Sequence, residues 1–172
     1  MDALAGPFAA AGALLALGGA FKVVRPLPTV GALRAVGAPA SPIAVRALGL
    51  VEATLGVAAV LTGAPALAAL VAAAYLAFAA FVMIAMRGGT ALQSCGCFGE
   101  VETPPSAAHV LLNVSLAGVS LAAAATGVPS VADTIADQPW SGVPFLLLVT
   151  VTVELCYLML TTLPIALRAA RA

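Results

Sequence analysis

The chain has 172 residues, of which 63% are hydrophobic and 8% are charged, and its seven Lys and Arg residues balance seven Asp and Glu residues. An ordinary soluble domain carries about 25% charged residues, so this chain has too few to cover a surface that faces water. The same numbers exclude a disordered chain, which needs low hydrophobicity, and a nucleic-acid binder, since seven scattered basic residues form no patch. An integral membrane protein remains.

Five segments have the length and apolar content of a membrane-spanning helix, which needs about 20 mostly apolar residues. They cover residues 3–24, 43–63, 65–87, 105–127 and 142–168, with loops expected at 25–42, 88–104 and 128–141. We therefore predict an all-α integral membrane protein. A four-helix transmembrane bundle over residues 1–127 is followed, over 128–172, by an extracytoplasmic or connecting loop and a fifth spanning helix.

The start of the fourth segment carries a recognisable helix signal. Thr103 is suited to cap a helix N-terminus, and Pro104-Pro105 follow it, where a missing backbone N–H costs nothing. Glu100 and Glu102 lie just before, where the helix dipole favours negative charge. The sequence therefore predicts a helix that begins at about residue 105.

Basic residues are distributed unevenly over the predicted loops. With five spans, one side of the membrane receives Lys22, Arg25, Arg34, Arg46, Arg87, Arg168 and Arg171, and the other receives Asp2, Asp133 and Asp137. Because Lys and Arg favour the cytoplasmic side, we expect the N-terminus outside, the C-terminus inside and the 88–104 loop in the cytoplasm.

Most of the chemistry lies in that loop, in the motif Cys95-Gly96-Cys97-Phe98-Gly99. Gly96 frees the backbone enough for the two sulfurs to approach. A disulfide across so short a loop is expected to be strained, and strained disulfides are the labile, catalytic kind. Alternatively, the two thiolates suit a soft metal ion such as copper, mercury or zinc, with His109, Glu100 and Glu102 as nearby further ligands.

Polar residues inside the predicted spans form two helical stripes. Ser106, His109, Asn113 and Ser120 share one face of the fourth segment, and Thr150, Glu154, Tyr157 and Thr161 share one face of the fifth. Asn, Ser and Thr are expected to hydrogen-bond between helices. Cys156 lies in the middle of the fifth segment, where a thiol usually acts as a small hydrophobe.

Two carboxylates, Glu52 and Glu154, lie near the middle of their predicted spans. Such groups are costly in a membrane, usually face the bundle interior or a cavity, and mark function. An unpaired carboxylate there is expected to be protonated at neutral pH, which suits it to proton transfer or to hydrogen-bonding a quinone-like ligand. We expect Glu52 to face the interior near the fourth segment, and Glu154, Tyr157 and Asn113 to form the candidate quinone site or proton pathway.

His109 lies one turn into the fourth predicted helix, just after the thiol loop. It is placed either to act as a base for Cys97 or to serve as a structural histidine at a helix interface. The candidate catalytic residues are therefore Cys95, Cys97, His109 and Glu52.

Four features in chain order resemble the methylamine utilisation protein MauE family, which is related to DoxX-like membrane proteins. They are the span ending in Gly18-Gly19-Ala20-Phe21-Lys22, the span carrying Leu50-Val51-Glu52-Ala53-Thr54-Leu55-Gly56, the Cys95–Gly99 motif, and His109-Val110-Leu111-Leu112-Asn113 at the start of the fourth span. Together they cover roughly residues 5–127. The Cys-Gly-Cys-Phe-Gly motif is the most specific of the four.

The resemblance implies a helical bundle in the bacterial cytoplasmic membrane. It also implies a thioredoxin-like partner, MauD in the methylamine system, and a role in maturing a disulfide-rich client, there the small subunit of methylamine dehydrogenase. Carried over to this sequence, Cys95 and Cys97 become the redox pair, with Glu52 and Asn113 as supporting positions. The chain departs from this pattern in its fifth span. Its basic residues also place the thiols in the cytoplasm, whereas an extracytoplasmic partner needs them outside.

The function expected from these observations is a membrane relay of thiol–disulfide equivalents, which acts as a thiol–disulfide oxidoreductase. One alternative is a soft-metal binding or transport protein that uses Cys95, Cys97 and His109. The other is a non-catalytic membrane assembly subunit. A quinone is the candidate cofactor of the relay, and no metal is favoured for it.

Overall fold

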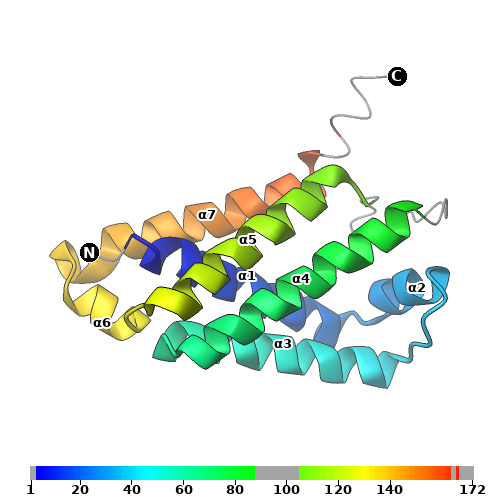
Figure 1. The fold of residues 1–172 in the computed structure, drawn as a ribbon, viewed down its shortest axis with the longest axis horizontal. Helices are drawn as coiled ribbons and strands as arrows, with labels where there is room; N and C mark the ends of the chain where they lie inside the picture. The colour runs from blue at the N-terminus through cyan, green and yellow to red at the C-terminus, as the bar shows by residue number, and fades with distance from the viewer. Residues whose placement is uncertain (1–2, 88–104, 164–165, 167–172) are drawn as a thin grey trace.

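The computed structural model describes residues 3–87, 105–163 and 166, and every element in these ranges is helical (Figure 1). The helices are α1 (Ala5–Val24), α2 (Leu27–Ala35), α3 (Pro42–Thr62), α4 (Pro65–Arg87), α5 (Ala107–Thr126), α6 (Val131–Ala136), the 3₁₀ helix η1 (Pro139–Gly142) and α7 (Val143–Thr161). Five of them, counting η1 with α7, are long and apolar enough to cross a membrane. The prediction of an all-α integral membrane protein is confirmed.

Two of the segments predicted as loops contain short helices. The helix α2 lies within 25–42, α6 lies within 128–141, and η1 begins there and ends at Gly142. Arg34 closes the first segment, because its guanidinium donates hydrogen bonds to the Ala40 carbonyl oxygen at 2.8 and 3.0 Å. In the second, the Ser130 hydroxyl caps α6 by accepting the Asp133 backbone N–H at 3.1 Å. The prediction of plain loops was wrong because both segments carry local capping or closing bonds that organise short helices.

The helix α5 begins at Ala107, two residues later than predicted, and its N-cap is Ser106 rather than Thr103. The backbone of Ser106 is extended, with φ −143° and ψ 164°. Its hydroxyl does not bond a backbone N–H, because it lies 2.8 Å from Nδ1 of His109. Thr103 and the motif Cys95–Gly99 lie outside the described residues.

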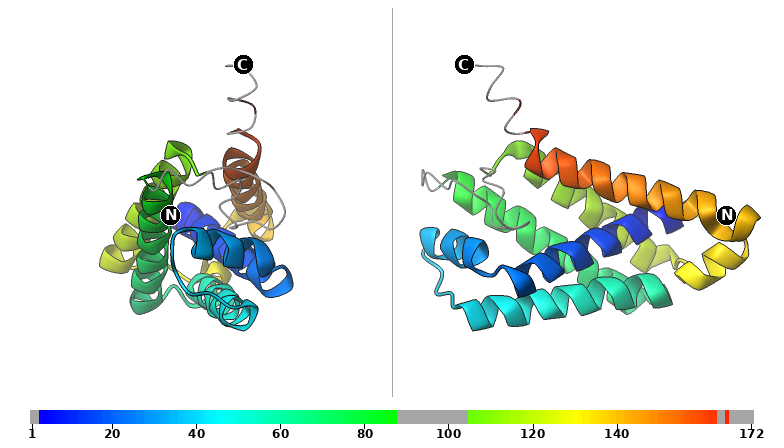
Figure 2. Two further views of the ribbon diagram at one scale, coloured as in Figure 1. Left: turned by 90° about the vertical axis from the view of Figure 1, so that its right-hand side faces the viewer. Right: turned by 180° about the vertical axis from the view of Figure 1, so that it is seen from behind.

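The helix α1 is the centre of the bundle. It packs most extensively against α3 and also contacts α7, α5, α4 and α6, while α4 and α5 form a second close pair. Figure 2 shows the same arrangement from two further sides, with α7 lying along α1. By contrast, α7 is the least buried of the five long helices. The four helices α1, α3, α4 and α5 therefore form the core of the bundle, and α7 packs against the outside of this core.

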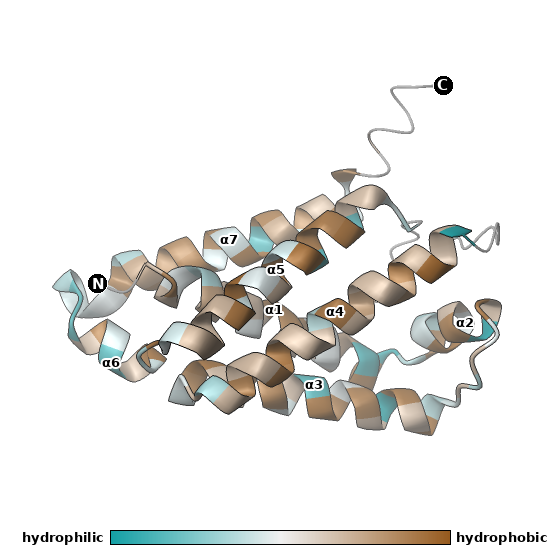
Figure 3. Cartoon of the chain, in the orientation of Figure 1, coloured by the Kyte–Doolittle hydropathy of each residue, from teal (hydrophilic) through white to brown (hydrophobic). Residues whose placement is uncertain are grey.

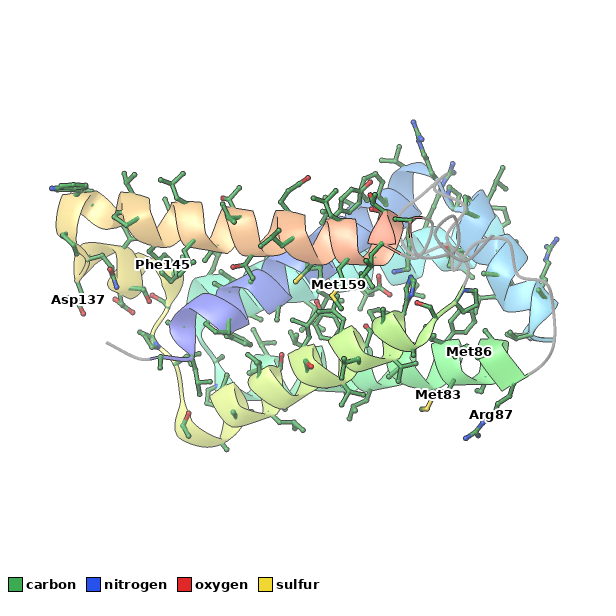
Figure 4. The ribbon with its side chains drawn as sticks, turned by 90° about the horizontal axis from the view of Figure 1, so that it is seen from above. Met83, Met86, Arg87, Asp137, Phe145 and Met159 are labelled. Carbon is green, nitrogen blue, oxygen red and sulfur yellow. The ribbon has the colours of Figure 1, made fainter. Side chains whose placement is uncertain are left out.

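Polarity is separated along the length of the bundle (Figure 3). Arg34, Arg46 and Arg87 are exposed at the end where α2 lies and α4 finishes, and Asp133 and Asp137 lie at the end formed by α6. Figure 4 shows Arg87 with Met83 and Met86 at one end and Asp137 with Phe145 at the other. The surface between the ends is apolar, with exposed side chains such as Val51, Leu70 and Leu147. An apolar band between polar ends is the surface of a membrane-embedded bundle.

The contact between α1 and α3 depends on glycine. A Cβ atom at Gly19 would lie 2.5 Å from the Ala53 nitrogen and 2.5 Å from the Gly49 carbonyl oxygen. A Cβ at Gly49 would lie 2.6 Å from the Gly19 carbonyl oxygen. Gly12 and Gly56 make the equivalent approach further along the same antiparallel pair. Small residues let membrane helices come this close, so the two backbones are in direct contact.

We expect Gly49→Ala to destabilise the protein by about 1–3 kcal/mol, the usual cost of adding a methyl group to a packed contact. The matched control is Gly118→Ala on α5, because a Cβ there meets nothing within 4 Å. Thermal unfolding of both variants in the same detergent measures the difference. Equal unfolding temperatures for the two variants would contradict the glycine contact.

Candidate functional site

A buried ion pair lies between α1 and α3. Nζ of Lys22 donates a hydrogen bond to Oε2 of Glu52 at 2.6 Å, and the two side chains are only 6% and 4% exposed. The sequence places Lys22 at the edge of the first loop, but the structure has it inside the bundle. The expectation of an unpaired carboxylate at Glu52 was therefore wrong, because its partner comes from another helix.

The glycine contact brings the pair together. Lys22 follows Gly19 by three residues, and Glu52 follows Gly49 by three, so each charged residue lies one turn from a contact glycine. The Cβ positions of Gly49 and Lys22 would be 2.7 Å apart. With the helices so close, the two side chains span the remaining distance. Nζ of Lys22 also lies 4.9 Å from the ring centroid of Phe78 on α4, where a ring face attracts a cation.

The pair borders a cavity in the bundle interior. Its polar and aromatic lining comes from Lys22, Glu52, Tyr75, Phe78, His109 and Asn113, and leucines of α1, α5 and α7 complete the wall. It offers about 30 Å³ to the centres of water-sized molecules. The other carboxylate oxygen, Oε1 of Glu52, is buried and has no hydrogen-bond partner among the described residues. Glu52 thus faces the interior beside α5, as the sequence predicts.

The helix α5 supplies His109 to the cavity, together with Leu112, Asn113 and Leu116. The His109 side chain is buried, and Nδ1 lies 2.8 Å from the Ser106 hydroxyl. The ring also interacts with the backbone of Leu160 on α7. The Asn113 amide donates a hydrogen bond to the His109 carbonyl oxygen at 2.7 Å and so holds the first turns of α5. The His109 ring is therefore held by Ser106 from its own helix and by the Leu160 backbone from α7.

The structure brings some of the predicted site residues together and separates others. Glu52, His109 and Asn113 line one cavity. Glu154 is exposed on the outer face of α7, contrary to the inward orientation expected of an intramembrane carboxylate. Tyr157 is half-buried, and neither residue is part of the cavity lining that the structure describes. Of the three residues predicted as a quinone site or proton pathway, Asn113 alone lines this described cavity.

The cysteines fall into two groups. Cys156 is half-buried and packs against the core cluster that contains Tyr75, as expected of a small hydrophobe. Cys95 and Cys97 lie outside the described residues. Within the described ranges, no group of three His, Cys, Asp or Glu side chains is arranged to hold a metal ion.

The hydroxyl and amide groups in the spans bond mainly to their own helices. Ser120, Thr150 and Thr161 each donate to the carbonyl oxygen one turn earlier, at 2.8 Å. The bonds recorded for these residues do not connect two helices, in contrast to the expectation from the sequence. A hydrogen bond that does cross between helices belongs to Tyr75, whose hydroxyl donates to the Ala11 carbonyl oxygen at 2.7 Å.

Reasoning from the sequence missed Lys22, Tyr75 and Phe78 as parts of the site. A signal for Lys22 was present, because it is a basic residue inside the predicted span 3–24. A charge within a span needs a partner, and Glu52 offers the opposite charge. Tyr75 and Phe78 carried no such signal, since aromatic residues are ordinary in a buried helix.

The profile of methylamine utilisation protein MauE matches residues 3–128. The chain belongs to the MauE family. The match covers α1 to α5 and ends before α6, so α6, η1 and α7 lie outside the matched residues. No curated protein matched the chain. No solved structure matched it either.

We expect Lys22→Met and Glu52→Met, each alone, to destabilise the protein by about 3–5 kcal/mol, because each leaves a buried charge without its partner. The double substitution removes both charges and should recover most of that loss. Thermal or denaturant unfolding in lipid nanodiscs measures the three variants. Additive losses in the double variant would show that the two side chains do not stabilise each other.

Proposed function

We propose that this MauE-family membrane protein is a thiol–disulfide relay. Cys95 and Cys97 pass reducing equivalents to a thioredoxin-like partner and support maturation of a disulfide-containing client. The proposal rests on the Cys-Gly-Cys motif and on one structural observation. Arg87 at the end of α4 and Ala107 at the start of α5, which flank the segment that holds the motif, line one groove.

The exchange with the partner has two steps. A thiolate of Cys95 or Cys97 attacks the disulfide of the partner, forms a mixed disulfide and releases one partner thiolate. The second cysteine attacks the mixed disulfide, which leaves a Cys95–Cys97 disulfide and the partner as a dithiol. The dithiol of the client then reduces the Cys95–Cys97 disulfide by the same chemistry and itself becomes a disulfide. Two electrons pass from client to partner.

His109 supports this chemistry as a proton acceptor near the thiol segment. It is the third residue of α5, the first helix after that segment. The N-terminus of α5 adds a partial positive charge that favours a thiolate over a thiol. In this proposal Asn113 positions His109 through its bond to the His109 carbonyl oxygen. Glu52 and Lys22 have a supporting role inside the bundle.

We expect Cys95 and Cys97 to form a reversible disulfide with a potential more oxidising than the about −300 mV typical of structural disulfides. The measurement is the mass added by a thiol alkylating reagent after equilibration in graded glutathione buffers. A Cys156→Ser background leaves only the two relay thiols to report.

Three results would contradict the relay. In the first, both thiols stay alkylatable in every buffer. In the second, the purified protein carries stoichiometric metal that Cys95→Ser removes, which assigns the motif to metal binding. In the third, the Cys95→Ser/Cys97→Ser variant still matures the client, which leaves an assembly role.

We further propose that the chain lies in the bacterial cytoplasmic membrane with its N-terminus outside and the segment 88–104 in the cytoplasm. Support comes from the exposed Arg34, Arg46 and Arg87 at one end of the bundle and Asp133 and Asp137 at the other. Lys22 adds nothing to this bias, because its charge is buried against Glu52.

This orientation predicts that a membrane-impermeant thiol reagent reaches Cys97 only after the cells are lysed. A Cys95→Ser/Cys156→Ser background keeps Cys97 as a single free thiol. The accessible control is Ala136→Cys on α6, at an exposed position that this orientation places in the periplasm. Labelling of Cys97 in intact cells would reverse the orientation and would fit an extracytoplasmic thioredoxin-like partner.

A further inference from the structure

Glu154 lies in the membrane-spanning part of α7 and is exposed on the side that faces away from the bundle. It is the twelfth residue of the helix, about 16 Å along the axis from its start and about 10 Å from its end. Among the described residues it has no hydrogen-bond or ion-pair partner. A glutamate side chain is also too short to reach the headgroups over such a distance, as the longer lysine and arginine side chains do.

A carboxyl group in this position is costly, because lipid hydrocarbon offers it no hydrogen-bond partner. The other carboxylate of the described spans, Glu52, avoids this cost inside the bundle, where Lys22 donates to it. Ionisable residues in membrane helices almost always face protein or a water-filled cavity and pair with one another or with the backbone. We therefore expect the outer face of α7 to be covered by protein rather than by lipid.

An apolar stripe surrounds Glu154 on this outer face. Leu147, Val151, Glu154 and Leu158 follow one another at spacings of four, three and four residues, and all four are exposed. Spacings of four and three are those by which two helices pair in a coiled coil. The residues of α7 that pack toward the bundle lie on the opposite face of the helix and are Phe145, Val149, Val153, Cys156 and Leu160.

The chemistry of the stripe suits a second copy of the same chain. Two copies inserted in the same orientation are related by a two-fold axis along the membrane normal, which brings their α7 helices together in parallel and makes identical residues meet. Such an interface needs side chains that complement themselves. A carboxyl group does so, because its protonated form donates an O–H to the carboxylate form. The helix α7 contains no other charged residue that would repel its copy.

We propose that the outer face of α7 is the interface of a homodimer in the membrane. Leu147, Val151 and Leu158 of the two copies pack against one another, and the two Glu154 carboxyl groups share a hydrogen bond between them. The inner face of α7 stays packed against α1, so each copy keeps its own interior cavity. The pairing uses none of the residues of the proposed relay.

The first test measures the dimer dissociation constant of the full chain in lipid vesicles. Protein labelled with a fluorophore at its N-terminal amine is reconstituted at graded protein-to-lipid ratios, and photobleaching steps count the copies. We expect Glu154→Leu to raise the dissociation constant about 3- to 15-fold, the range that interhelical hydrogen bonds reach in membranes. Glu154→Gln should stay close to the wild type, because an amide also donates and accepts.

The second test maps the face by disulfide cross-linking in a Cys95→Ser/Cys97→Ser/Cys156→Ser background. We expect Leu147→Cys to form a cross-linked dimer under mild oxidation. The matched control is Leu148→Cys, which is 61% exposed against 62% for Leu147. It lies at the same depth but about 100° around the helix, away from the stripe, so it should cross-link far more slowly.

Four results would overturn the proposal. In the first, the wild type is monomeric at every protein-to-lipid ratio, which leaves the face to lipid or to another protein. In the second, a dimer forms that Glu154→Leu does not weaken. In the third, Glu154→Gln weakens it as much as Glu154→Leu does, which contradicts the shared hydrogen bond. In the fourth, Leu148→Cys cross-links as fast as Leu147→Cys.

The dimer and the thiol relay are tested separately, because the cross-linking background lacks both relay thiols. Dimerisation in that background supports the interface whatever the outcome for Cys95 and Cys97. Reversible thiol chemistry in a protein that stays monomeric would support the relay and count against the interface.

Discussion

The ion pair between Lys22 and Glu52 is the interaction that organises this bundle. Two charges inside a membrane protein are tolerated only when they meet, and they meet because Gly19 and Gly49 allow α1 and α3 to touch. The pair thereby fixes the register of the central helix against its main neighbour. It also sets the polarity of the interior, since both side chains line the cavity shared with α4 and α5.

The membrane-spanning helices could be predicted from the sequence, because helix length and apolar content are properties of single segments. The limits of α4 were predicted without error, and Glu52 was correctly expected to face the interior. The short helices α2 and α6 were missed because they depend on local capping and closing bonds rather than on hydropathy. The start of α5 was misplaced because the Ser106 hydroxyl contacts an imidazole, which a capping rule does not anticipate.

The candidate site was harder to predict, since it depends on contacts between helices that are far apart in the chain. Spacing along one helix placed His109 and Asn113 on a common face but gave no sign that Lys22 joins them. The same reasoning grouped Glu154 with Tyr157, although α7 presents Glu154 to the outside. Periodicity shows which residues share a face of a helix, whereas packing decides what that face contacts. The helix α7 packs mainly against α1.

The position of Lys22 has a consequence for biogenesis. A helix that enters the bilayer alone with a charged residue near its centre loses about 2.5–3.5 kcal/mol of insertion free energy. Lys22 lies near the end of α1, where the loss is smaller, while Glu52 lies at the middle of α3. Because α1 is synthesised before α3, the Lys22 ammonium is in place near the lipid headgroups before Glu52 enters the membrane. The ion pair with Lys22 then offsets part of the cost of placing Glu52 of α3 in the lipid.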